Sequence, residues 1–157
     1  MGRMITASFP PTAQTAAHDL FEILAPALVG VKVHSLRIWQ TTELGDAAEE
    51  TLNLTFTRGV GAVTSGSGGT TPDIHQVDND DAAGGSTVEA RNTTQMAAGS
   101  GSLEIVDRDG WMIRQPYSRI YTPEERPKIK AGERLAIGLS APADSTTIGA
   151  AITYEEG

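Results

Sequence analysis

The stretch from Tyr121 to Glu155 reads YTPEERPKIKAGERLAIGLSAPADSTTIGAAITYE. Apolar residues alternate with other residues in two runs of this stretch. The two alternating sets are Leu135, Ile137 and Leu139, and then Ile148, Ala150, Ile152 and Tyr154. A period of two is typical of a β-strand with one buried face. Proline, glycine and an Asp-Ser pair flank the runs as turns. The stretch therefore predicts the closing antiparallel strands of an all-β fold.

Similar β-favouring runs, separated by turn residues, recur through the rest of the chain. They are Ile5–Phe9, Leu20–Ala25, Val31–Gln40, Leu52–Phe56, Thr87–Thr94, Leu103–Val106, Trp111–Arg114 and Tyr117–Tyr121. About eight to ten short strands at this spacing favour a sandwich or barrel. A chain of 157 residues suits one domain with a sizeable core. We expect a single-domain antiparallel β-sandwich over residues 1–157, with residues 1–19 as an N-terminal arm and first strand.

Four local features give finer expectations. The apolar positions of Val31–Gln40 change phase, which indicates either a β-bulge near Ser35 or burial on both faces. An Asp-Gly pair within Asp107–Gly110 predicts a hairpin turn. Residues 44–50 have the look of a short helical turn, with Asp46 as its cap. Residues 59–71, which are rich in glycine and serine, predict a flexible surface loop.

Charge and composition exclude several classes of protein. The formal net charge is -8, which argues against binding of nucleic acid, because that binding needs Lys and Arg to neutralise phosphates. The sequence has no run of about 18 apolar residues, so no membrane-spanning helix is expected. The first residues do not resemble a signal peptide. The chain has no cysteine, so disulfides and thiolate chemistry are excluded.

No residue pattern predicts catalysis or a cofactor. His18, His34 and His75 are not spaced as metal ligands, and the chain has no Gly-x-Ser-x-Gly nucleophile motif. Residues 78–81 (DNDD) resemble the opening of a calcium loop, but Ala82 and Ala83 stand where a ligand and a glycine are required. We interpret this acidic segment as a solvated loop, and whether it binds a weak cation stays open at this point. The chain is not expected to be an enzyme.

Four aromatic residues are candidates for an interface. Trp39 and Trp111 lie in predicted strands among polar neighbours, where a tryptophan either packs the core or anchors a partner. Tyr117 and Tyr121 lie in the predicted strand that leads into the closing stretch. In a binding module these four rings would line a groove for a receptor or carbohydrate.

Several segments together resemble a known family. They are LFEILAP, QTTELGD-AAEE-LNLTF-RG, SGSGG-TP, STVEARNTT and TPEERP-I-AGERLAIGLSAPADS-T-GAAITYEE, and they extend from about Phe21 to Glu156. In these segments the chain is similar to small virion-associated proteins of tailed bacteriophages. The resemblance implies a jelly-roll or tumour-necrosis-factor-like β-sandwich that is commonly a homotrimer. It implies no catalytic residue.

The resemblance implies a structural role in the virion, after assembly in the bacterial cytoplasm. The first hypothesis is a capsid decoration or cement protein, which binds the major capsid protein or another virion protein. The alternative is a receptor- or carbohydrate-binding module of a head fibre or tail. The head or tail location, the host and the contact loops are not indicated by the residues.

Overall fold

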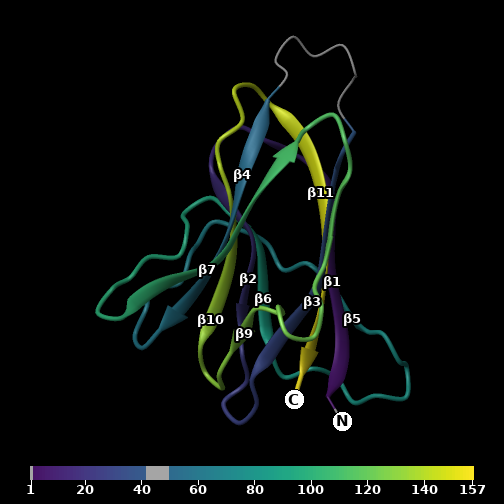
Figure 1. The fold of residues 1–157 in the computed structure, drawn as a ribbon, viewed down its shortest axis with the longest axis vertical. Coiled ribbons are helices and arrows are strands. Elements are labelled where there is room, and N and C mark those ends of the chain that lie inside the picture. The colour runs from purple at the N-terminus through teal and green to yellow at the C-terminus, as the bar shows by residue number, and fades with distance from the viewer. Residues whose placement is uncertain (1, 42–49) are drawn as a thin grey trace.

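The computed structural model describes residues 2–41 and 50–157, which form two antiparallel sheets packed face to face (Figure 1). The first sheet has the order β5 (Asp73–Gln76), β1 (Arg3–Gln14), β11 (Thr146–Glu156), β3 (Val31–Gln40), β8 (Tyr117–Ile120), and β9 (Lys128–Ile129) pairs with β3. The second has the order β6 (Thr87–Asn92), β2 (His18–Leu24), β10 (Arg134–Leu139), β4 (Thr51–Val60), β7 (Ser102–Met112). The prediction of an antiparallel β-sandwich is confirmed, and the short strands β5 and β9 add to the expected set.

The core lies between the two sheets and is built from alternate residues of each strand. In β10 and β11 the seven apolar residues that the alternation singled out are all buried. Phe9 of the first sheet packs against Phe21 of the second, with ring centroids 5.3 Å apart. Phe56 of β4 meets the ring of Tyr121 edge-on at 5.8 Å. The period of two in the sequence therefore does mark the inner faces of the sandwich.

Two strands contain irregularities in their pairing, of which the sequence predicts one. The pairing of β3 with β11 shifts between Ser35 and Val33, so the predicted bulge is confirmed. The prolines at positions 10 and 11, by contrast, do not end the first strand. Strand β1 continues to Gln14, and its register with β11 shifts between Phe9 and Thr12. Proline lacks the N–H that a ladder needs, and a bulge places such residues outside the regular pairing.

The predicted hairpin at Asp107–Gly110 is wrong. Strand β7 runs unbroken through it and pairs with β4 along its length. Asp107 and Asp109 face inward instead of turning, and each accepts a hydrogen bond from a tyrosine hydroxyl of the following segment. The turn comes later, where the Gln115 N–H donates to the Met112 carbonyl. The predicted helical turn at residues 44–50 lies outside the described residues, apart from Glu50.

Residues 59–71, predicted as a flexible loop, leave β4 after Val60 and then pair with the chain around β6. Three isolated bridges fix them: Thr64 with Ala97, Ser67 with Thr94, and Thr70 with Ala90. We call residues 61–71 and 93–101 together the cover, because they lie over the outer face of β2. In the described structure the glycine-rich segment thus has defined backbone partners.

Candidate functional site

Two acidic side chains are buried on the outer face of β2, beneath the cover. Glu22 lies opposite Ala136 of β10, and Asp19 lies opposite Gly138. The register of β2 with β10 shifts between Ile137 and Gly138, where Leu20 is left without a partner. This irregularity puts Asp19 on the same outer face as Glu22, although the two residues are three positions apart. The side chain of Glu22 is 0% exposed, and the residue Asp19 is 3% exposed. Buried acids require partners that compensate for the lost hydration.

Glu22 is held by four groups. Its Oε1 accepts hydrogen bonds from Ser65 Oγ (2.8 Å) and from the guanidinium of Arg134 (2.9 Å). Its Oε2 accepts from the backbone N–H of Gly66 (2.8 Å) and from Asn92 Nδ2 (3.1 Å). A Cβ at Gly66 would lie 2.6 Å from the Thr94 carbonyl and 2.8 Å from Glu22. Glycine is therefore what allows the cover to approach the carboxylate closely.

Asp19 holds the other half of the cover. Its Oδ2 accepts from the backbone N–H of Met96 at 2.8 Å, and its Oδ1 accepts from Gln95 Nε2 at 3.3 Å. Burial raises the pKa of Asp19 to about 6, and the nearby charge of Glu22 adds to this, against the Met96 hydrogen bond that lowers it. The carboxyl therefore takes up a proton far more readily than an exposed aspartate.

A groove of about 420 Å³ lies beside Asp19 on the outer face of the second sheet. Its floor consists of small outward-facing residues of β4 and β10. Its walls come from Ala17, the cover, β7 and the chain after β10. The floor residues are Thr55, Thr57, Ala136 and Gly138, and among the walls are Gln95, Met96, Leu103 and Ser140. The groove mixes hydroxyl, amide and aliphatic groups, as small-molecule sites do.

We expect the Asp19→Asn variant to be more stable than the natural chain at pH 7.5, but not at pH 4. Because the folded-state pKa is raised, the contribution of Asp19 is fully present below the unfolded pKa and is lost as pH rises through about 6. An asparagine cannot ionise and keeps an oxygen for the Met96 N–H. The difference in unfolding free energy between variant and natural chain should grow by about 2 kcal/mol from pH 4 to 7.5. Urea unfolding at both pH values measures it, and an unchanged difference would contradict the raised pKa.

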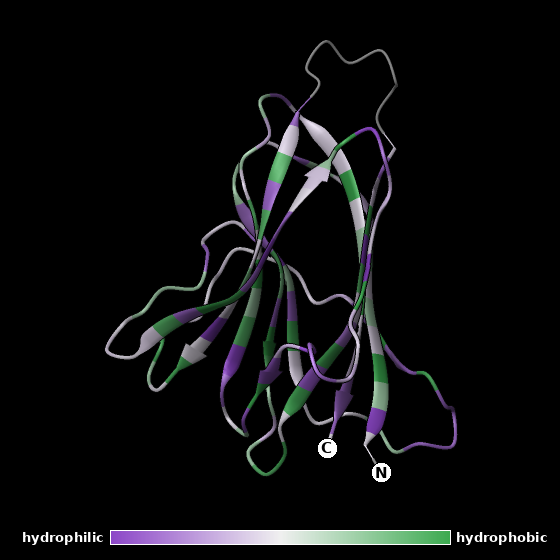
Figure 2. Cartoon of the chain, viewed as in Figure 1, coloured by the Kyte–Doolittle hydropathy of each residue, from purple (hydrophilic) through white to green (hydrophobic). Residues whose placement is uncertain are grey.

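A second surface lies where β7 and β8 form the free edges of the two sheets. Figure 1 shows the start of β7 projecting, with the end of β4, away from the other strands. Most of the large exposed apolar residues of the described chain lie on this side: Leu103 (39%), Ile105 (48%), Val106 (37%) and Met112 (47%) on β7, and Ile120 (78%) on β8. Figure 2 shows apolar colour at this projecting end. We call these five residues the β7–β8 patch.

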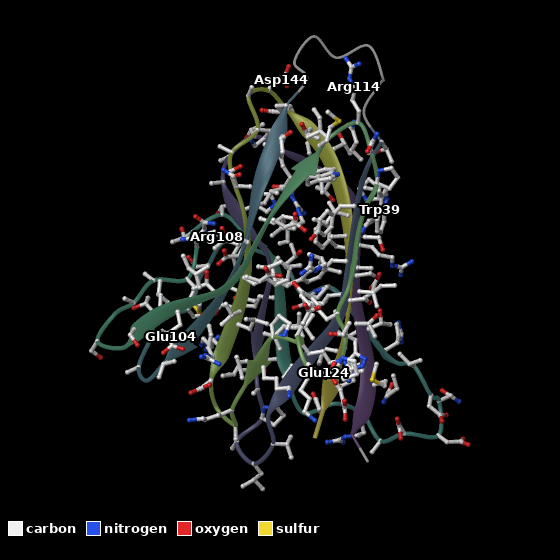
Figure 3. The ribbon with its side chains drawn as sticks, viewed as in Figure 1. Trp39, Glu104, Arg108, Arg114, Glu124 and Asp144 are labelled. Carbon is white, nitrogen blue, oxygen red and sulfur yellow. The ribbon has the colours of Figure 1, made fainter. Side chains whose placement is uncertain are left out.

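Polar contacts join the two edges beneath the β7–β8 patch. The hydroxyl of Tyr117 donates to Asp109 at 2.7 Å, and that of Tyr121 donates to Asp107 at 2.8 Å. The Arg119 guanidinium lies 5.0 Å from the centroid of the Tyr121 ring. Burial, followed by the aspartate partner, raises the pKa of both phenols, so both remain protonated donors at neutral pH. At the projecting end, Arg58 forms an ion pair with Glu104, which is labelled in Figure 3.

The four predicted aromatic residues do not line one site. Trp111 is 1% exposed, with its indole N–H donating to the Gln115 carbonyl, and Tyr121 is 3% exposed. Both rings belong to the core of the described chain. Tyr117 is half-buried between the sheet edges. Trp39, labelled in Figure 3, lies apart, against Gly149 on the outer face of the first sheet.

The histidines and the acidic loop are not brought together. Within residues 2–41 and 50–157, no three His, Asp or Glu side chains are grouped so as to hold a metal ion. His34 interacts with Glu155 at 3.2 Å and lowers the pKa of that carboxyl. Asp78 accepts the backbone N–H of Asp80, a local turn contact. The described chain also contains no helix long and apolar enough to cross a membrane.

Comparison with protein-family models finds no match, and comparison with curated proteins finds none either. The phage-like segments therefore remain a resemblance. The acidic residues at positions 19 and 22 were missed at the sequence level. One signal was present for Glu22, which interrupts the apolar run Leu20–Ala25 of a central strand, whereas Asp19 only precedes that run.

Proposed function

We propose that this chain is a structural protein of a bacteriophage virion, most concretely a capsid decoration or cement protein that acts as a homotrimer. The observation that carries the proposal is the β7–β8 patch. It combines a long edge strand with exposed apolar side chains along the free edges of the two sheets. Monomeric proteins rarely leave such an edge uncovered, because its free N–H and C=O groups pair with other chains. An assembly protein uses this same property.

The strand order supports the jelly-roll connectivity that the resemblance implies. Without the short β5, β6 and β9, the two sheets read β1-β11-β3-β8 and β2-β10-β4-β7. The chain passes to the opposite sheet in each of the steps β1 to β2, β2 to β3 and β3 to β4. It does so again from β7 to β8 and from β10 to β11. Two interleaved four-stranded sheets of this kind are what a jelly roll requires.

The mechanism that we propose is mechanical. Copies of the chain would pack their β7–β8 patches against one another about a symmetry axis, which would shield the apolar residues and the free strand edges. The assembled unit would then span neighbouring capsid subunits and resist the internal pressure of packaged DNA. Such a role needs only complementary surfaces and no reacting group.

The test is the copy number of the chain in purified virions, together with its state in solution. We expect a fixed, high ratio to the major capsid protein, and a trimer by light scattering. Ile105→Asp should dissociate the trimer and lower virion occupancy about tenfold or more, because it buries a charge. Val77→Asp is the matched control: Val77 is 60% exposed and follows β5, at the other end of the first sheet. Absence from virions, or an Ile105→Asp variant that behaves like the control, would overturn the proposal.

A further inference from the structure

We infer that the groove on the outer face of the second sheet is a binding site for a neutral saccharide. This site borders the β7–β8 patch, with which it shares the wall residue Leu103, but its floor and Asp19 lie outside the patch. It does not depend on the proposed role in assembly. It consists of the outward floor residues Thr55, Thr57, Ala136 and Gly138, with Asp19 and Gln95 at one side. None of the four aromatic residues predicted for a carbohydrate groove lines it.

The shape of the groove follows from small side chains on adjacent strands. Thr55 lies opposite Gly138, and Thr57 lies opposite Ala136, in the pairing of β4 with β10. All four project outward, and because they are small they leave a hollow across both strands. A Cβ at position 138 would approach Gln95 Nε2 to 3.0 Å and Asp19 Oδ1 to 3.4 Å. Glycine at this position therefore keeps the floor open next to the carboxyl of Asp19.

The polar groups of the groove match a ligand that carries several hydroxyls. Threonine hydroxyls both donate and accept, the amides of Asn53 and Gln95 offer one atom of each kind, and the carboxyl of Asp19 accepts. Met96 and Leu103 supply aliphatic surface among these groups. A sugar ring presents hydroxyls at its edge and C–H groups on its faces, and so can satisfy both kinds of surface at once.

Charge restricts the ligand further. The lining contains no Lys, Arg or His, so nothing there would compensate a phosphate, sulfate or carboxylate. Asp19 is the acidic residue of the lining, and in the natural chain its burial raises its pKa to about 6. A negatively charged ligand would meet this acid in a chain of net charge -8. A neutral saccharide avoids that repulsion, and the groove volume of about 420 Å³ falls within the range of small-ligand sites.

The experiment uses the full chain on an array of neutral, sialylated and sulfated glycans, followed by saturation-transfer NMR with the neutral glycans that are retained. Thr55→Phe fills the floor of the groove. Thr51→Phe is the matched control, because Thr51 is exposed on the same face of β4 and lies outside the groove lining. We expect binding of neutral glycans, a loss of affinity of about tenfold or more in Thr55→Phe, and no change in Thr51→Phe.

A second variant, Asn53→Ala, removes only an exposed amide and keeps the test valid if the larger side chain disturbs folding. It should weaken binding without changing the unfolding midpoint. Retention of no neutral glycan, retention of charged glycans alone, or equal binding by Thr55→Phe and Thr51→Phe would overturn the inference. An Ile120→Asp variant separates the two proposals, because Ile120 belongs to the β7–β8 patch but lies on β8 of the first sheet, outside the groove lining. It should lose assembly and keep glycan binding.

Discussion

Replacing Glu22 with alanine should lower the free energy of unfolding by about 3 kcal/mol or more at neutral pH. The carboxylate is fully buried and is the common acceptor for Ser65, Gly66, Asn92 and Arg134. Its loss leaves the buried N–H of Gly66 without an acceptor and Arg134 without its counterion. An unpaired N–H and an unpaired charge each lower the stability of the fold when they are shielded from water. Urea unfolding at pH 7.5 measures the change.

The matched control is Glu89→Ala. Glu89 lies directly opposite Glu22 in the pairing of β2 with β6, but it is only partly buried. Its side chain accepts one hydrogen bond, from Asn92 Nδ2 at 2.8 Å. A cost of about 1 kcal/mol or less is expected for this variant. Equal costs for the two glutamates would mean that burial and the ion pair with Arg134 contribute little.

The contacts of Glu22 add to the prediction made for residues 59–71, which composition describes only as a flexible loop. Glycine and serine at positions 59–71 indicate little hydrophobic packing, and composition alone favours mobility. In the fold these small residues serve a close approach, because Gly66 donates to Glu22 and leaves no room for a side chain. The partners are distant in sequence, and only the pairing of β2 with β6 and β10 brings them together. No local pattern contains that information.

The inner faces of the sheets could be predicted because their pattern is local. A strand that buries one face repeats every second residue, so Leu135 and Ile137, or Ile148 and Ile152, reveal their orientation without any partner being known. Strand ends are less certain, since a bulge can carry two prolines within β1. The Asp-Gly pair at position 109 does not form a turn, because β4 pairs with β7 on both sides of it. Asp107 and Asp109 instead accept hydrogen bonds from tyrosine hydroxyls.

The role of the aromatic residues also could not be predicted from local sequence. Tryptophan is favoured both in cores and at interfaces, so its type does not distinguish the two. The structure makes the distinction: Trp111 faces inward from β7, while Trp39 covers Gly149 on an outer face. The exposed apolar surface of β7 consists instead of aliphatic residues and Met112, which the sequence did not single out.

Replacing Trp111 with alanine should therefore destabilise the fold rather than only weaken an interface. The ring is among the largest fully buried side chains, and its N–H is satisfied by the Gln115 carbonyl at 2.6 Å. Loss of this volume should cost about 3–5 kcal/mol in unfolding free energy. Trp39→Ala, at a half-buried surface position, should cost clearly less. Thermal and urea unfolding of the two variants, each with light scattering, compare stability with assembly.

The comparison also tests where the interface lies. If Trp111 anchored a partner, its alanine variant would keep the stability of the monomer and lose the oligomer. The core position predicts the reverse order, in which stability falls first and assembly fails only through unfolding. Ile105→Asp should show the complementary behaviour, with little change in monomer stability, because Ile105 is 48% exposed. Two variants of one strand would thus separate its inner, core-forming face from the outer face that we propose for assembly.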